Sequence, residues 1–572
     1  MKNLHSKLLL REIAVKKSVI IFAVFIGLIN VCVSIAIPAL IGRAIDDRSE
    51  SPLTSVALLT ALVIISAASS YVLQRFAYNI AYETAASLRM KAERKLNSLS
   101  ISKIDRTAKG DVLNTVSVDM EILSDGIIQG ILQFIPGVLT VLGTIIIMLV
   151  INFRLALVVI IITPLSLLTA KLITGRSKRE FASQSAIRAG LTAHADEWIG
   201  GQSVVKAFNM ENESISKFSA TNEKLRKVGF KAQLFSALVN PTTRFVNGLV
   251  YTFTGLVGLL LILNVIPGGA TVTVGVLAAF LSYANQYTKP FNEISATYAE
   301  LQNALSSAKR IFTLLGEPEE DNSEENAYIP MNDCLEVSHL DFSYNEDKKT
   351  LQDINFKLQK GENIAVVGPT GCGKTTLINL LERFYEPDSG QILSDGTDIK
   401  NYSKPSLRKN ISMVLQDSFI FNDTIAANIR YGHPEATAGQ AEEAARIIGA
   451  HSFIKRLPER YDTVITGNRE LSTGQKQLIS LSRVMLANMI SPASLLILDE
   501  ATSNIDTVTE RKIKKAVKIL TEGRTSIIIA HRLSTIKDSD MIIVIDGGKI
   551  VETGTHDSLI TAGGVYENMY RA

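Results

Sequence analysis

Long uncharged runs separated by charged stretches fill the first half of the chain. Crossing the hydrocarbon core of a bilayer takes roughly 20 apolar helical residues, because each residue rises about 1.5 Å and the core is about 30 Å thick. The stretches that meet or approach this length are Ser18–Ile41, Thr54–Tyr78, Ile127–Val150, Leu155–Ile173, Phe245–Ile266 and Val272–Tyr287. The pattern therefore predicts six membrane-spanning helices, of which the sixth is the least clear by hydropathy.

The distribution of basic residues predicts how these helices are oriented. Lys and Arg precede the first predicted span and crowd Arg89–Lys109 and Lys171–Lys231, whereas the connections Asn152–Arg154 and Asn264–Thr271 carry almost none. Cytoplasmic loops carry the excess of positive charge, so both termini and the two long, mostly helical connections are expected in the cytoplasm. A secretory signal is the alternative interpretation of the first span, but that span is too long for a signal core and lacks a small-residue cleavage site.

The second half has the composition of an α/β protein, so the 572 residues are expected to form more than one domain. We place a helical membrane domain at residues 1–315, an acidic linker at 316–333 and an α/β domain at 334–572. The net charge of +3 argues neither for nor against nucleic acid, which is not an expected partner. The cysteines Cys32, Cys334 and Cys372 have no metal-ligand spacing and indicate no disulfide framework.

A glycine-rich segment in the second half indicates phosphate binding. The short apolar run Ile364–Val367 reads as a buried strand, and GPTGCGKT, Gly368–Thr375, follows it directly and opens a helix. Glycines let the backbone turn tightly, so that N–H groups and a helix N-terminus surround an anionic phosphate. Lys374 is expected to reach the β- and γ-phosphates, and Thr375 to offer its hydroxyl to Mg²⁺.

A second motif adds catalytic chemistry to this loop. The segment SLLILDE, Ser494–Glu500, reads as an apolar strand that ends in two acids. We expect Asp499 to hold Mg²⁺ through water and Glu500 to position or deprotonate the attacking water, which indicates an ATPase of the P-loop NTPase fold. An acidic helix cap is the alternative for an isolated acid pair, but a phosphate loop earlier in the same domain disfavours it.

The order of motifs resembles the ATP-binding cassette (ABC) family. LSTGQ, Leu471–Gln475, lies shortly before SLLILDEATSNID, Ser494–Asp506, and this order is far more specific than either motif alone. The resemblance implies that Tyr344 stacks on adenine and that His531 contacts the γ-phosphate. It also implies that Gln416 contacts Mg²⁺ or water and links the ATP site to the membrane domain.

The resemblance further implies a dimer that holds ATP with Mg²⁺. In this family the signature residues Ser472, Gly474 and Gln475 cap the nucleotide held by the partner chain, and Asp506 lies in a loop at that interface. The residues expected to bind nucleotide within this chain are Tyr344, Gly368, Thr370, Gly371, Cys372, Gly373, Lys374, Thr375 and Thr376. Because Cys372 lies inside the phosphate loop, thiol reagents are expected to block ATP hydrolysis.

The membrane half resembles the exporter type of the family, with six spans before the ATPase domain. Two stretches carry this resemblance, Gly110–Gly126 and Glu197–Glu213. In them Asp119, Phe208 and Glu211 are the residues expected to couple the spans to the ATPase domain. An ordinary solvated helix face is the alternative interpretation of both stretches.

One departure from the family pattern bears on the partner. Thr473 stands where the family commonly has Gly, whereas Lys374, Glu500 and His531 match the family pattern, so the chain resembles the catalytically complete subunit of bacterial heterodimeric multidrug exporters. This resemblance favours a heterodimer. Because the predicted spans are mainly apolar with few charges, we expect export of a lipophilic or amphipathic substrate, and the absence of a transit-peptide composition before span one favours a bacterial plasma membrane. The alternatives are a homodimeric lipid or peptide exporter and a membrane-anchored ATPase that gates or regulates a channel.

Overall fold

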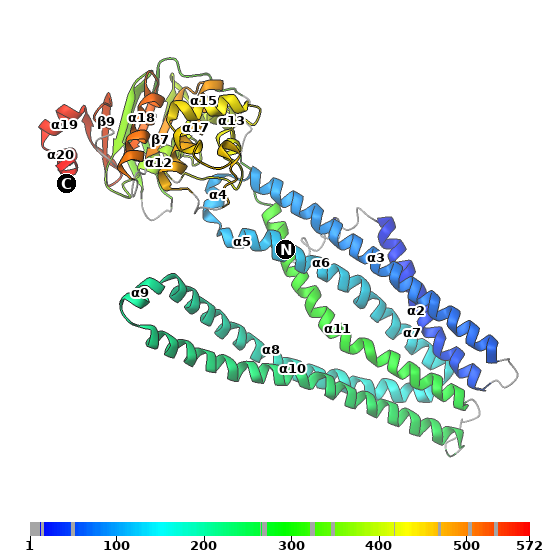
Figure 1. The fold of residues 1–572 in the computed structure, drawn as a ribbon. Helices are drawn as coiled ribbons and strands as arrows, with labels where there is room; N and C mark the ends of the chain where they lie inside the picture. Colours follow the sequence, from blue (N-terminus) through cyan, green and yellow to red (C-terminus); the bar gives the residue numbers. More distant parts are fainter. Residues whose placement is uncertain are drawn as a thin grey trace. The chain divides into compact units, whose positions relative to one another are not determined.

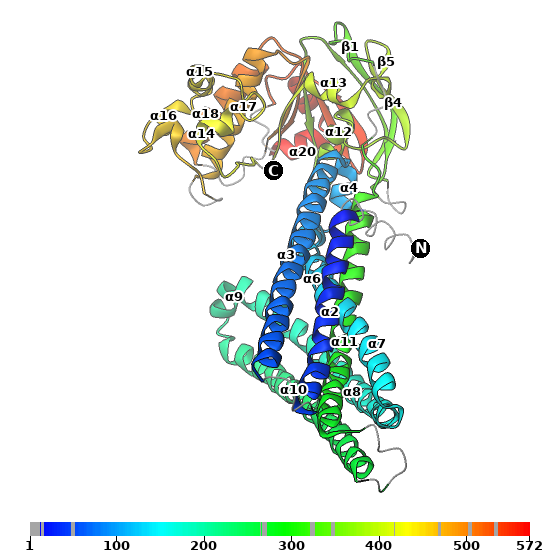
Figure 2. The same cartoon turned by 90° about the vertical axis from the view of Figure 1, so that its right-hand side faces the viewer.

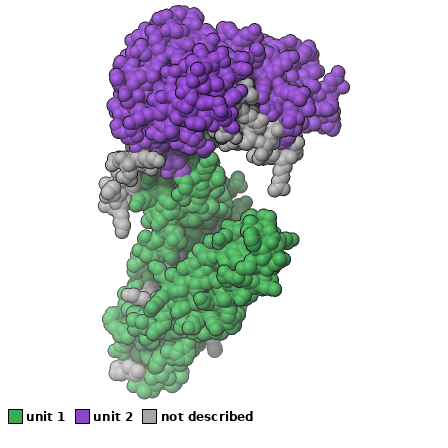
Figure 3. All heavy atoms as spheres, turned by 90° about the vertical axis from the view of Figure 1, so that its left-hand side faces the viewer, with its two compact units in different colours: residues 1–97, 108–317 green, residues 98–107, 318–572 purple. Residues whose placement is uncertain are grey.

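The structure is a computed structural model, and it divides into two compact units. It describes residues 12, 17–46, 52–263, 265, 272–320, 326–344, 349–416, 418–466, 471–500, 506–530 and 536–571. Unit 1 comprises residues 1–97 and 108–317, and unit 2 comprises residues 98–107 and 318–572 (Figure 3). Residues 98–107 thus belong to unit 2, although they lie between predicted spans two and three.

Unit 1 is helical throughout its described residues. Its helices are α2 (Lys17–Asp46), α3 (Pro52–Ser98), α5 (Lys109–Asn114), α6 (Met120–Gln129), α7 (Ile135–Ile151), α8 (Phe153–Gly200), α9 (Gln202–Ala207), α10 (Glu211–Ile262) and α11 (Val274–Leu315), with π-helical segments η1 (Thr115–Asp119) and η2 (Gly130–Phe134). Helices α8 and α10 form a long hairpin with α9 at its tip (Figure 1). The two long connections predicted to be helical are therefore largely helical.

Four described helices are long and apolar enough to cross a membrane. They are Ile21–Asp46, Pro52–Ser98, Lys109–Ile151 and Glu211–Ile262. Predicted span four lies in α8, whose apolar stretch is Phe153–Leu165, and predicted span six lies in α11. The helical membrane domain is confirmed, and the count of six spans stays a prediction.

Helix α11 is tied to α2 by polar contacts inside an apolar core. The Tyr283 hydroxyl donates to the Ile35 carbonyl at 2.7 Å, and Gln286 Nε2 donates to the Ser34 carbonyl at 3.0 Å. Around them pack buried side chains of α2, α7, α8, α10 and α11. Since buried polar groups must be paired, these bonds fix one register between the two helices.

The described residues of unit 2 form two sheets. The antiparallel sheet has the order β2-β1-β4-β5 and the larger sheet the order β10-β9-β3-β8-β7-β6. The strands are β1 (Cys334–Phe342), β2 (Leu351–Gln359), β3 (Asn363–Val367), β4 (Ser389–Ser394), β5 (Thr397–Asp398), β6 (Ile411–Val414), β7 (Leu495–Glu500), β8 (Ser526–Ala530), β9 (Met541–Asp546) and β10 (Lys549–Gly554). Strands β9, β3, β8, β7 and β6 run parallel, and β10 closes the edge antiparallel.

Helices cover the larger sheet and complete the α/β fold. Those with described bounds are α4 (Ile101–Arg106), α12 (Lys374–Leu381), α13 (Lys404–Lys409), α14 (Ile425–Ile429), α15 (Ala438–Ile448), α16 (His451–Ile454), α17 (Thr473–Ile490), α18 (Thr507–Thr521), α19 (His556–Ala562) and α20 (Val565–Arg571), with 3₁₀ turns η4 (Ile399–Asn401) and η5 (Arg460–Asp462). Within unit 2, α14 to α18 gather on one side and β1, β4 and β5 on the other (Figure 2). The sheet residues between them are buried on both faces, as parallel strands require.

Candidate functional site

The parallel sheet brings the predicted motifs to one edge. In the strand register Asp499 of β7 lies opposite Ile529 of β8, and Ile529 lies opposite Val366 of β3. Adjacent strands are about 4.8 Å apart, so the Asp499 backbone lies about 10 Å from β3. The carboxyl ends of β3, β7 and β8 therefore point the same way, which is the edge where open α/β sheets bind ligands.

Three of the predicted catalytic residues lie at or just after the ends of β6, β7 and β8 in the chain. Gln416 lies two residues beyond β6 and is exposed. Glu500 is the last residue of β7 and pairs in register with Ala530, but its side chain is outside the described part of the structure. His531 directly follows β8 and lies outside the described residues. The roles expected of these three residues stay predictions.

The loop Gly368–Thr375 has a backbone that requires glycine. Gly368, Gly371 and Gly373 have φ of 152°, 82° and 110°, values that side-chain-bearing residues rarely adopt. A Cβ on Gly368 would lie 2.0 Å from the Ile545 carbonyl oxygen, and one on Gly373 would lie 2.5 Å from Leu351 Cδ2. The positive φ values therefore explain all three glycines, and close approach to neighbouring residues is a further reason at Gly368 and Gly373 only.

Lys374 is held over this loop. Its Nζ donates to the carbonyls of Gly368 at 2.8 Å and Pro369 at 2.9 Å, and lies 3.8 Å from Cys372 Sγ. The Lys374 and Cys372 side chains are each only 5% exposed. A buried ammonium at the start of α12, beside backbone N–H groups of a tight loop, makes an anion-binding cradle that fits phosphate.

The oxygen donors expected at this site, the Asp499 carboxylate and the Thr375 hydroxyl, suit Mg²⁺. They are too few for a metal whose ligands all come from the protein. Asp499 is buried, and Thr375 is exposed in the first turn of α12. No cluster of three His, Cys, Asp or Glu side chains occurs among the described residues. Mg²⁺ is usually held by one or two protein oxygens together with substrate phosphates, so a single carboxylate and a hydroxyl are a fitting donor set.

An aromatic cluster lies at the end of β1. Tyr344 packs edge-on against Phe342, with ring centroids 4.9 Å apart, and against Tyr385 at 5.1 Å. Asn379 Nδ2 of α12 donates to the Tyr344 hydroxyl at 3.3 Å. Tyr344 is thereby fixed beside the helix that carries the phosphate loop, with its ring partly exposed.

Helix α4 contacts the same cluster within unit 2. The Tyr385 hydroxyl donates to the Asp105 carboxylate at 2.9 Å, and Arg106 Nη2 lies 3.5 Å from the Tyr344 carbonyl oxygen. Burial and the Asp105 carboxylate raise the pKa of Tyr385 to about 12, so its hydroxyl keeps the proton that it donates. Sequence patterns did not single out Asp105, Arg106 or Tyr385, because no local pattern indicates that a segment before span three packs on residues near 385.

The signature and the loop before α18 form helix N-termini. Ser472 Oγ accepts from the Gln475 N–H at 3.3 Å, and Gln475 Oε1 accepts from the Ser472 N–H at 2.9 Å, so the two residues form a capping box for α17. Thr473 is the exposed first residue of α17, and Gly474 is buried. Asp506 caps α18, and bonds from two backbone N–H groups lower its pKa.

The predicted coupling residues lie in two parts of unit 1. Asp119 ends η1 and is buried, where it accepts from Arg310 Nε at 2.7 Å and from the Ser307 hydroxyl at 2.8 Å. Phe208 is 72% exposed at the tip of the α8–α10 hairpin, and Glu211 is exposed at the start of α10. Asp119 therefore joins two helices within unit 1, whereas Phe208 and Glu211 offer an exposed surface.

Comparisons with known proteins agree with this arrangement. Two protein families match the chain. The family described as ABC transporter transmembrane region matches residues 19–291, and the family described as ABC transporter matches residues 351–503. The ABC transporter ATP-binding protein YfiC of Bacillus subtilis (strain 168) is 38% identical over 568 residues, which are 98% of this chain and 92% of that protein. The chain belongs to the ABC transporter family. Its membrane domain and its ATPase domain are fused in one polypeptide, in the manner of an exporter half-transporter.

Two further similarities support the exporter type of this ABC chain. The fatty acid ABC transporter ATP-binding/permease protein of Mycobacterium tuberculosis (strain CDC 1551 / Oshkosh) is 38% identical over 532 residues, 93% of this chain and 83% of that protein. The solved structure of a bacterial Atm1-family ABC exporter with ATP bound has a TM-score of 0.79 at 26% identity, covering 98% of each chain. A helical membrane domain followed by an α/β ATPase domain, the membrane location with a cytoplasmic ATPase domain, and ATP hydrolysis coupled to transport are thereby confirmed, and the number of spans stays a prediction.

Proposed function

We propose that this chain is one half of an ATP-driven exporter that moves a lipophilic or amphipathic substrate out of a bacterial cell. The observation that carries the proposal is the meeting of the phosphate loop, Asp499 and Glu500 at one sheet edge, in a chain that also carries long apolar helices. The similarity to a fatty acid transporter protein supports an amphipathic substrate. In this proposal the ATP site lies at the cytoplasmic face of the plasma membrane.

ATP with Mg²⁺ is the cofactor of the proposed site. Lys374 and the loop N–H groups would hold the phosphates, Tyr344 the adenine, and Thr375 with Asp499 the Mg²⁺, which supplies charge neutralisation at the phosphates when bound. Glu500 orients and deprotonates water from the end of β7, and His531 lies beyond the neighbouring strand β8. Gln416, in the segment after β6, would contact Mg²⁺ or water and link the ATP site to the membrane domain.

A second chain completes the proposed site. Ser472, Gly474 and Gln475 begin α17, and the positive end of this helix favours a partner's γ-phosphate. Thr473, where the family commonly has Gly, is exposed at the first position of α17 and adds a side chain that the capping box does not use. This supports a heterodimer in which LSTGQ faces the weaker of two ATP sites and Lys374, Glu500 and His531 serve the stronger.

Exposed apolar surfaces support coupling through the partner. Ile199, Val204 and Phe208 are exposed at the tip of the α8–α10 hairpin. In unit 2, Leu415 and Phe419 on either side of Gln416 are exposed as well. We propose that the hairpin tip of one chain buries against the segment around Gln416 of the other, which links hydrolysis to movement of the spans by alternating access.

The test is the ATPase activity and particle mass of the chain purified alone in lipid nanodiscs, compared with any ABC chain that co-purifies from the host. A single-chain preparation that is inactive until the second chain is added supports the heterodimer. Robust activity of a two-copy particle establishes a homodimer and refutes the asymmetric role of LSTGQ. Proteoliposomes loaded with a fluorescent lipid analogue then separate export from gating, because a gating ATPase hydrolyses ATP without moving the lipid.

A further inference from the structure

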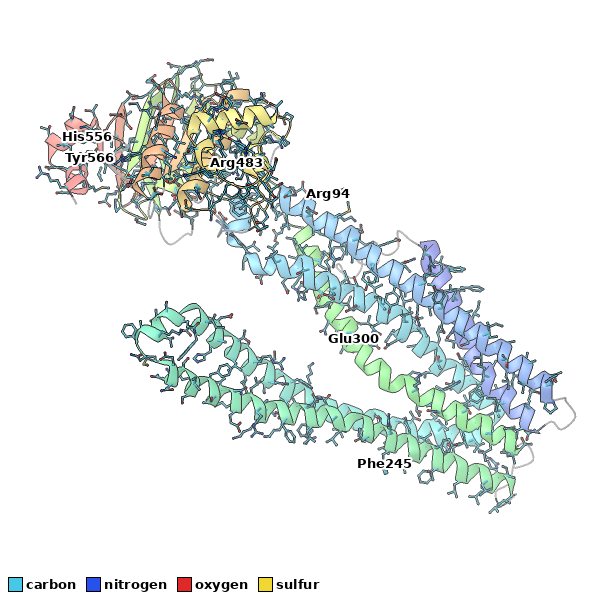
Figure 4. All side chains as sticks on the ribbon, in the orientation of Figure 1. Arg94, Phe245, Glu300, Arg483, His556 and Tyr566 are labelled. Carbon is cyan, nitrogen blue, oxygen red and sulfur yellow. The ribbon has the colours of Figure 1, made fainter. Side chains whose placement is uncertain are left out.

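Arg483 ties α17, the helix that begins at the signature, to another segment of unit 2 (Figure 4). That segment comprises residues 419–431 and follows β6 in the chain; we refer to it as the aromatic segment. Arg483 Nε donates to the Asn428 backbone carbonyl at 2.9 Å, and Nη2 donates to the Phe419 carbonyl at 3.3 Å. These acceptors are 55 and 64 positions away in the chain, so one side chain of α17 holds two points of a distant segment.

Two rings of the aromatic segment complete the surroundings of the guanidinium. Phe421 and Tyr431 stack, with ring centroids 4.1 Å apart and an interplanar angle of 12°. Arg483 Cζ lies 5.8 Å from the Phe421 centroid and 5.4 Å from the Tyr431 centroid, within the range of cation–π attraction. A planar guanidinium suits such a site, because it can stack on rings while its N–H groups reach separate carbonyls.

Asn428 braces the aromatic segment from inside. Its side chain is buried, and its Nδ2 donates to the carbonyls of Phe421 and Thr424, each at 3.0 Å. Its Oδ1 accepts from the Phe421 N–H at 2.8 Å. A buried amide whose donor and acceptor are both bonded holds the backbone around it in one conformation. Arg483 therefore contacts a segment that is fixed internally, and a movement of α17 is passed to the whole segment.

The aromatic segment also has an exposed apolar side. Phe419 is 61% exposed and Tyr431 is 56% exposed. Their rings belong to one cluster, because Phe421 packs edge-on against Phe419 with centroids 4.9 Å apart and stacks on Tyr431. Exposed apolar side chains that lie together are typical of a contact surface. Phe419 is also one of the residues onto which the partner's hairpin tip is proposed to dock.

We propose that Arg483 is a positioning residue that makes the start of α17 and the exposed rings of Phe419 and Tyr431 move as one body. The inference rests on the proposed export function, in which the start of α17 caps a partner's ATP. Because α17 is one continuous helix of 18 residues, a displacement at Ser472 reaches Arg483. The two carbonyl bonds and the ring contacts then carry the displacement to the docking surface. Arg483 itself need not touch nucleotide.

Two substitutions of Arg483 separate its geometry from its charge. Arg483→Gln removes the charge, and Arg483→Lys keeps the charge but lacks the planar donors, so both are expected to fail. In the complex with its second chain, we expect the KM for ATP to stay within about twofold of wild type. Transport of a fluorescent lipid analogue per ATP hydrolysed is expected to fall about threefold to tenfold, the effect of losing one or two hydrogen bonds.

Controls separate this role from a general loss of stability. Arg511→Gln changes an exposed arginine of α18, and Tyr431→Phe keeps the ring that faces Arg483, so both are expected to match wild type. Tyr431→Leu removes that ring and tests the same contact if the Arg483 variants do not fold; it is expected to lower transport per ATP. Wild-type transport per ATP in Arg483→Gln, or a lower unfolding midpoint with unchanged transport per ATP, overturns the proposal.

Hydrogen exchange gives a measurement that requires neither hydrolysis nor transport. Adenylyl imidodiphosphate with Mg²⁺ is added to the complex, and exchange is read by mass spectrometry in peptides of this chain. In the wild type we expect the analogue to slow exchange in residues 368–375 and in the aromatic segment. In Arg483→Gln the change in residues 368–375 is expected to remain, and the change in the aromatic segment to fall below about half.

The outcomes distinguish this inference from the export proposal. Loss of the change in the aromatic segment of Arg483→Gln, in a complex whose wild type hydrolyses ATP without moving lipid, keeps the role of Arg483 and refutes export. Lipid movement by the wild type with the full change in the aromatic segment of Arg483→Gln refutes the role of Arg483 and leaves export intact. No change in the aromatic segment of the wild type overturns the inference as well.

Discussion

Glu382 gives a stability prediction whose size follows from its surroundings. It ends α12, the helix of the phosphate loop, and is only 6% exposed. The nearby Arg408 binds the Glu320 carboxylate with two bonds of 2.8 and 2.9 Å, and it reaches only the backbone carbonyl of Glu382, at 3.0 Å. Burial therefore raises the pKa of Glu382 from 4.5 to about 7, and the charge of Arg408 lowers it only in part.

The direction of the pH effect follows from this raised pKa. Between pH 4.5 and about 7 the folded chain keeps the proton on Glu382 and the unfolded chain has lost it. The stabilisation from this group is complete below pH 4.5 and is lost as the pH rises through about 7. A shift of this size corresponds to about 3 kcal/mol, since each pKa unit is about 1.4 kcal/mol.

The substitution Glu382→Gln removes the titration and leaves the shape nearly unchanged. At pH 8 we expect the variant to unfold about 6 to 12 °C above the wild type, because a domain of this size gains about 2–4 °C per kcal/mol. At pH 5 the two proteins are expected to unfold within a few degrees of each other. The assay is scanning fluorimetry of the full chain in detergent, with Glu459→Gln, an exposed glutamate of unit 2, as the control.

Two outcomes would contradict this reasoning. The same difference between Glu382→Gln and wild type at pH 5 and pH 8 would mean that charge on Glu382 is not the cause. A lower midpoint of Glu382→Gln at pH 8 would mean that the ionised carboxylate is stabilised by Arg408 more than burial destabilises it. In that case the charge of Arg408 would stabilise the Glu382 carboxylate even though the Arg408 guanidinium is bonded to Glu320.

Other predictions concern the ATP site and its connections. Glu500→Gln is expected to lower the ATPase rate at least a hundredfold with ATP binding kept, and a wild-type rate in a purified dimer would refute the assigned base. Labelling of Cys372 by N-ethylmaleimide is expected to block ATP hydrolysis, and bound ATP is expected to slow this labelling. Full ATP turnover after Cys372 is labelled would contradict the prediction. Tyr385→Phe is expected to keep basal hydrolysis within about threefold and to lower transport per ATP, whereas unchanged transport would show that the bond to Asp105 does not couple.

The sequence predicted the parts of the ATPase domain that depend on local pattern. The apolar run Ile364–Val367 is a buried strand, and SLLILDE forms β7 from Leu495. Each run is short, rich in aliphatic residues and followed by turn or acidic residues, so its strand character is set by neighbours in the chain. The glycines of Gly368–Thr375 were predictable for the same reason, since the left-handed φ values arise within the loop itself.

Contacts between distant segments could not be predicted in this way. Asp119 was expected to act in coupling, but its pairing with Arg310 joins residues 191 positions apart, and no local pattern records it. The π-helical segments η1 and η2 also have no signal in hydropathy, because they depend on how the helix packs.

The assignment of residues 98–107 to unit 2 also depends on contacts between distant segments, so local sequence patterns could not predict it. Of these contacts, it matters most for the mechanism. Asp105 and Tyr385 are 280 positions apart, yet one bond joins them, and Arg106 approaches the carbonyl of Tyr344 in the same cluster. Tyr344 and Tyr385 touch edge-on, so a change in the position of either ring must be accommodated by the other and by α4. Along the chain, α4 begins at Ile101, shortly after α3 ends at Ser98. The adenine expected on Tyr344 would thus act on a packed aromatic group, and close packing passes small displacements on rather than absorbing them.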